Sequence, residues 1–256
     1  MMELLVRERR RHFCEHAGGR DAPAGDGPLD ENKKGMSKDS SGVERRKSGM
    51  HMDRASSSTV TRLSSYYRLL GELEAEDVET VSSTRLAERG SITSAQVRKD
   101  LSFFGNFGRR GLGYNVRQLR RKIGEILGLT RNWRVALLGA GNLGLALFAY
   151  HAFQDQGFCI EAVFDRDPNK IGRKWGSIVI CDIDELGSMA ETQAFDIAII
   201  AVPQNAAQDV ADAAVGAGIR GILNFAPVKL NIGGGVALRD VDLSIAMESL
   251  SYALVK

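Results

Sequence analysis

The chain has 256 residues, of which 43% are hydrophobic and 26% charged, a composition typical of a soluble protein with one or two ordinary domains. No apolar run reaches the roughly 18 residues of a membrane span, and Leu4–Val6 is too short for the core of a signal peptide. We therefore expect no membrane partner. The three cysteines, Cys14, Cys159 and Cys181, lack metal-ligand spacing, so no metal site is predicted, and their odd number fits a cytoplasmic location.

The formal net charge of +2 conceals an asymmetry between the two halves of the chain. Residues 133–256 carry nine Lys and Arg against fourteen Asp and Glu, a net charge of −5, which leaves +7 on the first 132 residues. A basic half favours contact with a polyanion such as DNA. From the totals alone, a chance distribution of surface charge explains the asymmetry equally well.

Residues 1–52 predict a disordered N-terminal extension. The stretch from Gly18 to Ser48 is rich in Gly, Asp, Lys, Ser and Arg and has almost no large apolar side chain. Such a segment cannot bury enough surface to offset the entropy lost on ordering. Met36, Met50 and Met52 leave a later start codon open.

Residues 53–131 predict a domain that begins with three helices. Residues 58–76 place apolar side chains at helical steps, namely Val60, Leu63, Tyr67, Leu70 and Leu73. A short second helix in residues 82–90 is expected to begin after Ser82 or Ser83 and to end at Gly90. A third, in residues 93–105, follows Thr93 or Ser94, ends at Gly105 and carries an inner stripe of Val97, Leu101 and Phe104. Two short helices joined by a glycine turn predict a helix-turn-helix.

A glycine-rich hairpin and a fourth helix follow. Gly108, Gly111 and Gly113 permit a tight β-hairpin with Arg109 and Arg110 at its tip. Residues 116–128 predict a helix that turns Leu119, Ile123 and Ile126 inward. Helices followed by a hairpin describe a winged helix.

The basic residues of this half predict a DNA-binding surface. Between Ser94 and Lys122 there are eight basic residues and one acid. Arg98, Lys99 and Gln96 share the polar side of the third helix, where they can reach base edges in the major groove. The hairpin arginines suit a wing, and Arg117, Arg120, Arg121 and Lys122 can neutralise phosphates. The alternative is a small helical domain with a solvated basic face.

Residues 132–238 predict a Rossmann domain, because apolar strands alternate with helices as in a parallel sheet covered on both faces. Strands are expected in residues 134–138, 159–165, 197–203 and 221–226, with helices in 143–153 and 206–218. The predicted fold class is thus α/β, a winged helix-turn-helix followed by a doubly wound parallel domain. Residues 239–256 predict a further helix with an apolar stripe of Leu243, Met247, Leu250 and Leu254. This stripe is expected to pack on a partner surface; the alternative is that it packs on its own domain.

A glycine loop in the second half predicts a dinucleotide site. Gly139, Gly141 and Gly144 spell G-x-G-x-x-G between the first strand and the first helix, and Asp165 ends the next strand 21 residues later. An acid there accepts hydrogen bonds from the ribose and repels a 2′-phosphate, so NAD(H) is favoured over NADP(H), although neighbouring Arg166 weakens that inference. The alternatives are another adenine nucleotide, coenzyme A, or a tight turn without ligand. The expected contacts are Gly139, Ala140, Gly141, Asn142, Leu143, Gly144, Asp165, Arg166, Val202, Pro203 and Asn224.

No catalytic group accompanies the predicted cofactor. Hydride transfer to a carbonyl usually needs His, Lys or Tyr beside the substrate. His151 is the sole histidine after residue 132 and falls late in the first predicted helix of this domain; no Tyr-x-x-x-Lys pair occurs. After Asp165 the 91 remaining residues leave no room for a substrate domain. We therefore predict a sensor and not an enzyme; the rival is an NAD-dependent enzyme that carries a winged helix.

From about Ser57 to the C-terminus, the sequence resembles the Rex family of redox-sensing transcriptional repressors. The motifs that carry the resemblance are QVRKDLSFFGNFGRRGLGY, LLGAGNLG, VFDRDP and GILNFAPV. The resemblance implies a homodimer with an exchanged C-terminal helix, bound to operator double-stranded DNA and released when NADH binds, so that it responds to the NADH/NAD⁺ ratio. Together with the surface pattern, it gives the expected DNA contacts Ser94, Gln96, Arg98, Lys99, Arg109, Arg110 and Tyr114.

The resemblance also implies a ligand-driven switch. Tyr150 matches a tyrosine linked to the switch, and Asp242 matches an acid that exchanges partners, with Arg68 as its partner in the DNA-bound form. Two positions depart from some members: Asn142 replaces an arginine of the pyrophosphate loop, and Leu243 replaces a phenylalanine after the switch acid. These departures predict lower pyrophosphate affinity and looser discrimination between reduced and oxidised cofactor.

Overall fold

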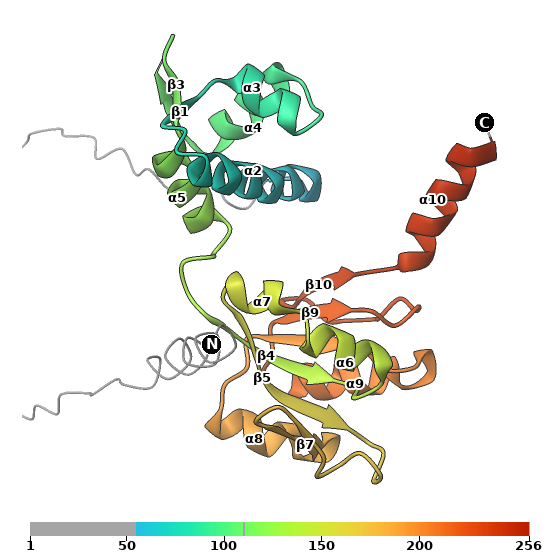
Figure 1. The fold of residues 1–256 in the computed structure, drawn as a ribbon. Helices are drawn as coiled ribbons and strands as arrows, with labels where there is room; N and C mark the ends of the chain where they lie inside the picture. Colours follow the sequence, from blue (N-terminus) through green and yellow to red (C-terminus); the bar gives the residue numbers. More distant parts are fainter. Residues whose placement is uncertain (1–54, 110, 256) are drawn as a thin grey trace, which may run out of the picture.

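The computed structural model describes residues 55–109 and 111–255 of the chain. These residues form two units, each with its own hydrophobic core, joined by the segment that follows α5 (Figure 1). The expected extension at residues 1–52 lies outside the described residues, and so does Arg110.

The first unit is a winged helix-turn-helix. Its elements are α2 (Ser57–Ala75), β1 (Thr80–Val81), α3 (Ser83–Arg89), α4 (Ser94–Phe104), β2 (Gly108–Arg109), β3 (Gly113–Asn115) and α5 (Val116–Ile126). The four helices begin where the side chains of Ser56, Ser82, Thr93 and Asn115 accept a backbone N–H of the first turn, and this satisfies donors that have no partner inside a helix. Strands β1, β3 and β2 pair antiparallel in that order, and Arg109 pairs with Gly113 just before the hairpin turn.

The core of this unit differs from the prediction on α2. Leu63, Tyr66, Leu70 and Leu73 are buried, whereas Val60 is 39% exposed and Tyr67 lies at the edge of the core. Tyr66 replaces Tyr67 inside because its hydroxyl has a buried carboxylate to bind, and a tyrosine is buried at low cost only where its hydroxyl finds a partner. Val97 and Leu101 of α4 and Leu119 and Ile123 of α5 complete the core, as expected.

The segment between the two units is tied at both ends. The indole N–H of Trp133 donates to the carbonyl of Gly128 at 2.8 Å, and the guanidinium of Arg131 lies 3.7 Å from the Trp133 ring. Arg131 also donates to Asp196 at 2.9 Å, at the start of a strand of the second unit. Gly128 has φ +71°, and a Cβ there would lie 3.0 Å from the Trp133 ring. Glycine is therefore required at this position, just after the end of α5.

The second unit is a doubly wound α/β domain. Its seven strands follow the order β10-β9-β8-β4-β5-β7-β6, with all pairs parallel except β6 with β7. The strands are β4 (Trp133–Leu138), β5 (Phe158–Asp165), β6 (Lys174–Trp175), β7 (Ile178–Asp182), β8 (Ile197–Ile200), β9 (Gly221–Asn224) and β10 (Ala237–Asp240). From β4 the chain adds β5, β7 and β6 on one side of the sheet and then β8, β9 and β10 on the other. The strand order therefore reverses between β4 and β8, which is where open α/β sheets bind ligands.

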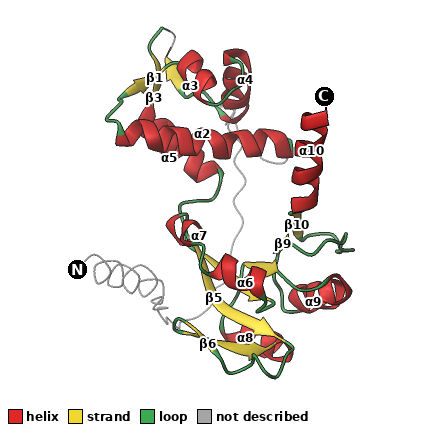
Figure 2. Ribbon diagram, turned by 45° about the vertical axis from the view of Figure 1, so that its right-hand side comes forward, coloured by secondary structure: helices red, strands yellow, loops and turns green. Residues whose placement is uncertain are grey.

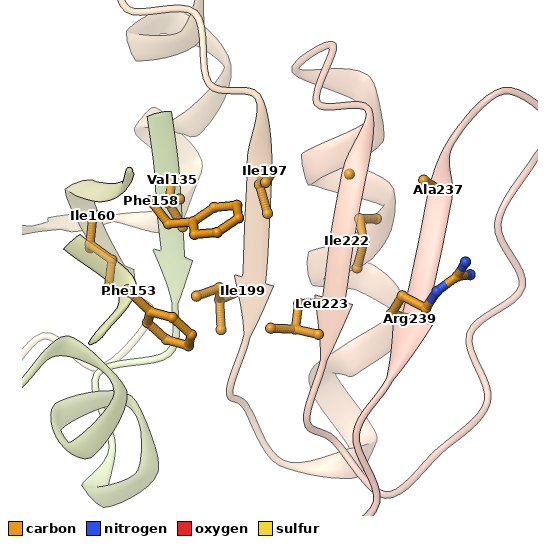
Figure 3. A pocket seen from close by; sticks show the side chains of 11 residues that line it. Val135, Phe153, Phe158, Ile160, Ile197, Ile199, Ile222, Leu223, Ala237 and Arg239 are labelled. Atoms are coloured by element: carbon orange, nitrogen blue, oxygen red, sulfur yellow. The ribbon is translucent and has the colours of Figure 1, made fainter. Parts of the chain in front are cut away.

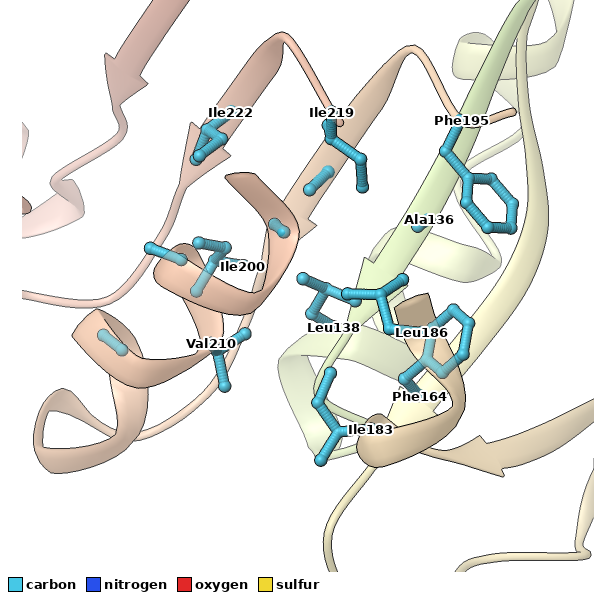
Figure 4. Close-up of a cluster of buried hydrophobic side chains, with 14 of the residues drawn as sticks. Ala136, Leu138, Phe164, Ile183, Leu186, Phe195, Ile200, Val210, Ile219 and Ile222 are labelled. Carbon is cyan, nitrogen blue, oxygen red and sulfur yellow. The ribbon is translucent and has the colours of Figure 1, made fainter. Parts of the chain in front are cut away.

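Helices cover one face of this sheet fully and the other in part. The 3₁₀ turn Ile183–Glu185, α8 (Leu186–Thr192) and α9 (Gln204–Gly216) pack against Ala136, Leu138 and Ile200 (Figure 4). On the opposite face α6 (Asn142–Phe148) and α7 (His151–Asp155) pack against Val135, Leu137 and Val163. Alternate residues of β4 thus point to opposite faces.

The single helix predicted for residues 143–153 is wrong, because the helix breaks between α6 and α7. Tyr150 has extended backbone angles, φ −79° and ψ 93°. In a continuous helix Phe153 would be rotated by about 140° from Phe148 about the axis. The break instead lets both rings pack against the same sheet face. Exposed His151 therefore begins α7 rather than ending a long helix.

Helix α10 (Leu243–Val255) stands away from the sheet (Figures 1 and 2). None of its residues is buried, and Leu243, Met247, Leu250 and Leu254 are between 55% and 80% exposed. The boundary expected at residue 239 falls inside β10, whose residues 239 and 240 pair with β9. No helix among the described residues has the length and apolarity needed to cross a membrane.

Candidate nucleotide site and DNA-binding surface

The glycine loop connects β4 to α6 at the point where the strand order reverses. Gly139 has φ +110°, and a Cβ there would lie 2.5 Å from the carbonyl oxygen of Ala201. A Cβ on Gly144 would collide with the carbonyl of Gly139, so both positions need glycine for the turn itself. Gly141 has nothing within 4 Å of its missing side chain. The open space at Gly141 leaves the backbone accessible to a ligand phosphate, as in dinucleotide loops.

A cavity of about 460 Å³ opens beside this loop. Its walls come from the ends of β4, β5 and β8 and from the first turns of α9. Among the expected contacts, Gly139, Gly141, Asp165, Arg166, Val202 and Pro203 line it. Apolar walls together with charged side chains suit an adenosine, whose flat aromatic base packs on apolar groups and whose ribose hydroxyls need polar ones.

Asp165 is held tightly at the charged end of the cavity. Its Oδ2 accepts the N–H of Ala140 at 2.7 Å and the ammonium of Lys170 at 3.0 Å, and its Oδ1 accepts the N–H of Asp167 at 2.9 Å. Burial raises the pKa of this carboxyl, but these donors outweigh burial and hold the pKa of Asp165 below its ordinary value of 3.8. Asp165 is therefore a carboxylate at neutral pH and can accept ribose hydroxyls.

The remaining expected contacts fall into two groups. Asn142 and Leu143 are exposed on the first turn of α6, and Ala140 is buried with its N–H committed to Asp165. Asn224 is fully buried, and its amide donates to the carbonyls of Ala226 and Val228 and to Asp240 while its oxygen accepts the N–H of Ala226. Its side chain therefore closes the turn after β9 and does not line the cavity, and the ligand contact expected at Asn224 stays a prediction.

The polar side of α4 faces outward beside the hairpin. Arg98 and Lys99 are exposed, and Arg98 donates to the hydroxyl of Ser83 at 3.0 Å. A cavity of about 480 Å³ between α4 and the hairpin is lined by Ser82, Ser83, Arg98, Ser102 and Tyr114, among others. Burial raises the pKa of Tyr114 above its ordinary value although Arg98 opposes the shift, so its hydroxyl stays protonated and able to donate. Ser83 is a polar group of this surface that the sequence suggested only as a cap.

Gln96 belongs to a buried network. The carboxylate of Asp100 accepts hydrogen bonds from Arg62 at 2.6 and 2.8 Å, from Tyr66 at 2.8 Å and from Gln96 at 2.7 Å. Asp100 is 3% exposed, so this network fixes the outer helix α4 against α2. One N–H of the Gln96 amide thus binds within the protein, and because the amide also has a second N–H and an oxygen, its expected contact with DNA stays a prediction. The one acid in a basic helix was the available signal, and sequence reasoning missed it.

Four basic residues of α5 have acidic partners. Arg117 and Arg120 lie 3.6 and 2.6 Å from Glu74, while Arg121 and Lys122 lie 3.8 and 2.7 Å from Glu125. The two glutamates offset two of the four positive charges, so a net charge of +2 remains for the expected role of these residues as phosphate neutralisers. Ser94, in contrast, opens α4 and is half-buried.

The residues assigned to a switch lie in separate elements. Arg68 is exposed on α2, and Tyr150 is 56% exposed in the break between α6 and α7, with its ring 5.1 Å from that of Phe153. Asp242 accepts the N–H of Ser244 and opens α10, where Leu243 is 64% exposed. Within the described part of the chain, no ion pair joins Arg68 to Asp242. Across residues 55–109 and 111–255, no group of three or more His, Cys, Asp or Glu could hold a metal ion.

A winged helix and a dinucleotide-type site on one chain define a ligand-responsive transcription regulator. The redox-sensing transcriptional repressor Rex of Desulforamulus reducens is 47% identical over 196 residues, which is 77% of this chain and 93% of that protein. The chain belongs to the Rex family of redox-sensing transcriptional repressors. Family membership places it among DNA-binding regulators rather than dehydrogenases.

Solved structures and family models agree with this assignment. RSP in complex with β-NAD⁺ and operator DNA matches with a TM-score of 0.76 and 37% identity, over 78% of this chain and 93% of that chain. RSP in complex with β-NADH matches with a TM-score of 0.72 and 36% identity, over 78% of this chain and 94% of that chain. A family model described as "CoA binding domain" matches residues 130–228, and one described as "Putative DNA-binding protein N-terminus" matches residues 55–102.

Proposed function

We propose that this chain is a cytoplasmic repressor that binds operator DNA through its winged helix and leaves it when NADH fills the Rossmann site. The observation that carries the proposal is the pairing on one chain of a glycine loop whose Gly141 is open to a phosphate with an outward-facing basic helix. RSP supports it, since that repressor is found with operator DNA and β-NAD⁺ and also with β-NADH. We assign residues 53–131 to DNA, 132–240 to NAD(H), so that β10 stays with its sheet, and 241–256 to dimer formation.

In this proposal Asp165 accepts an adenosine ribose hydroxyl, and the backbone at Gly139–Gly144 receives the pyrophosphate. The cavity beside the loop has apolar side chains such as Val202 along its wall toward the centre of the sheet. Apolar surroundings favour neutral reduced nicotinamide over its cationic oxidised form, because burying an unpaired cation is unfavourable. Arg68, Tyr150, Asp242 and Leu243 are assigned to the switch that relays this difference.

A homodimer is part of the proposal. Beyond α6 and α7, the sheet face over β8, β9 and β10 holds an apolar cavity of about 260 Å³ lined by Phe153, Ile197, Ile199 and Leu223, among others (Figure 3). The exposed apolar side chains of α10 are too many for a helix that stays in water. We propose that α10 packs on a second copy of the chain.

Deleting residues 243–256 tests the dimer. The shortened chain is expected to run as a monomer in sedimentation or light scattering, whereas the intact chain runs as a dimer, because the deletion removes the apolar surface that needs a partner. A dimer of unchanged stability after the deletion would place the interface elsewhere. The Rossmann core should stay folded in both, since no residue of α10 is buried in it.

The function is tested by adding ligands to the protein bound to operator DNA. NADH is expected to release the DNA at concentrations at which NAD⁺ does not. ATP and coenzyme A serve as competitors, because other nucleotides and coenzyme A also use this fold. Release by coenzyme A or ATP but not by NADH would contradict the proposed ligand, and steady oxidation of NADH with a small carbonyl would favour an enzyme.

Arg98→Ala is expected to weaken specific operator binding by roughly 10- to 100-fold, the loss typical of one bidentate base contact. NADH binding should stay unchanged, because Arg98 lies in the other unit. The matched control is Arg117→Ala, which removes the same charge from a residue paired with Glu74. Fluorescence anisotropy on operator and on scrambled DNA measures both variants. Equal losses of operator affinity in the two variants would show that Arg98 contributes only its positive charge and makes no base contact.

A further inference from the structure

The acid at the ribose end of the nucleotide cavity has a cation bound to it. Lys170 Nζ lies 3.0 Å from Asp165 Oδ2 and 3.9 Å from Asp167 Oδ2, and Arg166 is next along the chain from Asp165. All four of these charged residues line the same cavity. We propose that Lys170 is a specificity-determining residue, which offsets the charge of Asp165 and so weakens rejection of a dinucleotide phosphorylated on its adenosine 2′-hydroxyl. The proposal rests on the proposed function, because it concerns the same site.

Lys170 is held in place by the turn that follows β5. Its N–H donates to the carbonyl of Asp167 at 2.9 Å, and the side chain of Asp167 accepts the N–H of Asn169 at 2.9 Å. The side chains of Lys170 and Asp165 are 34% and 11% exposed, so the ion pair is partly shielded from solvent. An acid alone at this position repels a 2′-phosphate. The ammonium at 3.0 Å, although it also lies 3.9 Å from Asp167, offsets part of this negative charge and is close enough to meet the phosphate.

The hydrogen-bond capacity of Asp165 separates the two cofactors. A carboxylate has about four acceptor positions, and the N–H groups of Ala140 and Asp167 and the ammonium of Lys170 occupy three. Removing Lys170 frees one position for a ribose hydroxyl, so NADH is expected to bind as well as before or more tightly. In the same variant the 2′-phosphate of NADPH has no ammonium to bind and is repelled by the carboxylate of Asp165, whose charge Lys170 no longer offsets. The two affinities should therefore move apart.

The test compares direct titrations of NADH and NADPH, followed by nicotinamide fluorescence, on the full chain and on Lys170→Met. The variant is expected to raise the ratio of the NADPH to the NADH dissociation constant by about tenfold or more, the loss of one charge-assisted hydrogen bond. Lys170→Arg keeps the charge, and Lys174→Met removes one from an exposed lysine four residues away. Both should keep the ratio within about threefold of the unmodified chain.

Three results would overturn the inference. A ratio in Lys170→Met that stays within about threefold of the unmodified chain would show that Lys170 does not set specificity. Loss of both cofactors by the same variant would assign Lys170 to general binding. If the unmodified chain binds neither cofactor, the proposed function itself fails and the inference with it, and that result is distinct from the other two.

Discussion

Asp100→Ala is expected to destabilise the winged-helix unit by roughly 2–4 kcal/mol and to abolish operator binding at moderate temperature. The substitution leaves the hydroxyl of Tyr66 buried without its acceptor and the guanidinium of Arg62 without its partner. Because three hydrogen bonds from Arg62 and Tyr66 of α2 hold Asp100 of α4 in place, the loss should fall on the helix that we propose to face DNA. Chemical unfolding followed by far-ultraviolet circular dichroism measures it, and Glu88→Ala, at an exposed site on α3, is the control.

The same residue predicts a pH dependence. Burial raises the pKa of Asp100, but hydrogen bonds from Arg62, Tyr66 and Gln96 outweigh burial and hold the pKa below its ordinary value of 3.8. A depressed pKa in the folded state means that the stabilisation is fully present above about pH 4–5 and is lost as the pH falls through the folded pKa. Stability should therefore fall less steeply between pH 5 and 3 in Asp100→Ala than in the unmodified chain. Parallel slopes would contradict the assigned role.

Asp165→Ala is expected to weaken NADH binding by about 10- to 100-fold, the loss of one charge-assisted hydrogen bond to the ribose. Operator affinity without ligand should be unchanged, because Asp165 lies in the other core. NADPH should lose less than NADH, since Lys170 is then freed from its partner. Isothermal titration and operator binding measure the two effects, with Asp184→Ala, an exposed acid of the same domain, as control. Loss of both activities would indicate misfolding instead of a ligand contact.

Local patterns in the sequence predicted much of the fold. The caps at Ser82 and Thr93 and the stop at Gly90 lie where hydrogen bonds within a few residues decide the structure. The strand that ends in Asp165 was predicted from its run of apolar residues, which marks a buried strand without naming its partners. The short strands β6 and β7 and the break at Tyr150 were not predicted. Strand β6 pairs with its neighbour β7 in a hairpin of two residue pairs, too short to give a periodic pattern. The position of β7 depends on its pairing with β5, and the break at Tyr150 depends on packing against the sheet, neither of which periodicity along the chain reports.

The candidate site shows the same division. The glycine loop and Asp165 line a single cavity, as their spacing predicted. The loop follows the first strand of the domain and Asp165 ends the second, and adjacent parallel strands end at the same edge of the sheet. The roles of Asp100 and Asn224 depend on partners up to 38 and 16 residues away, and the ion pair of Lys170 with Asp165 depends on a turn whose shape the sequence did not specify. Polar side chains that bind the protein itself and polar side chains that await a ligand look alike in a sequence.

We propose that ligand binding at the nucleotide site changes the affinity of the winged helix for DNA. The most direct test is the affinity for NADH, titrated on the free protein and on the protein saturated with operator DNA. Because coupling between two sites is reciprocal, operator DNA must weaken NADH binding by the same factor by which NADH weakens operator binding. We predict equal factors in the two titrations. An NADH affinity that does not change when operator DNA is bound would contradict the account.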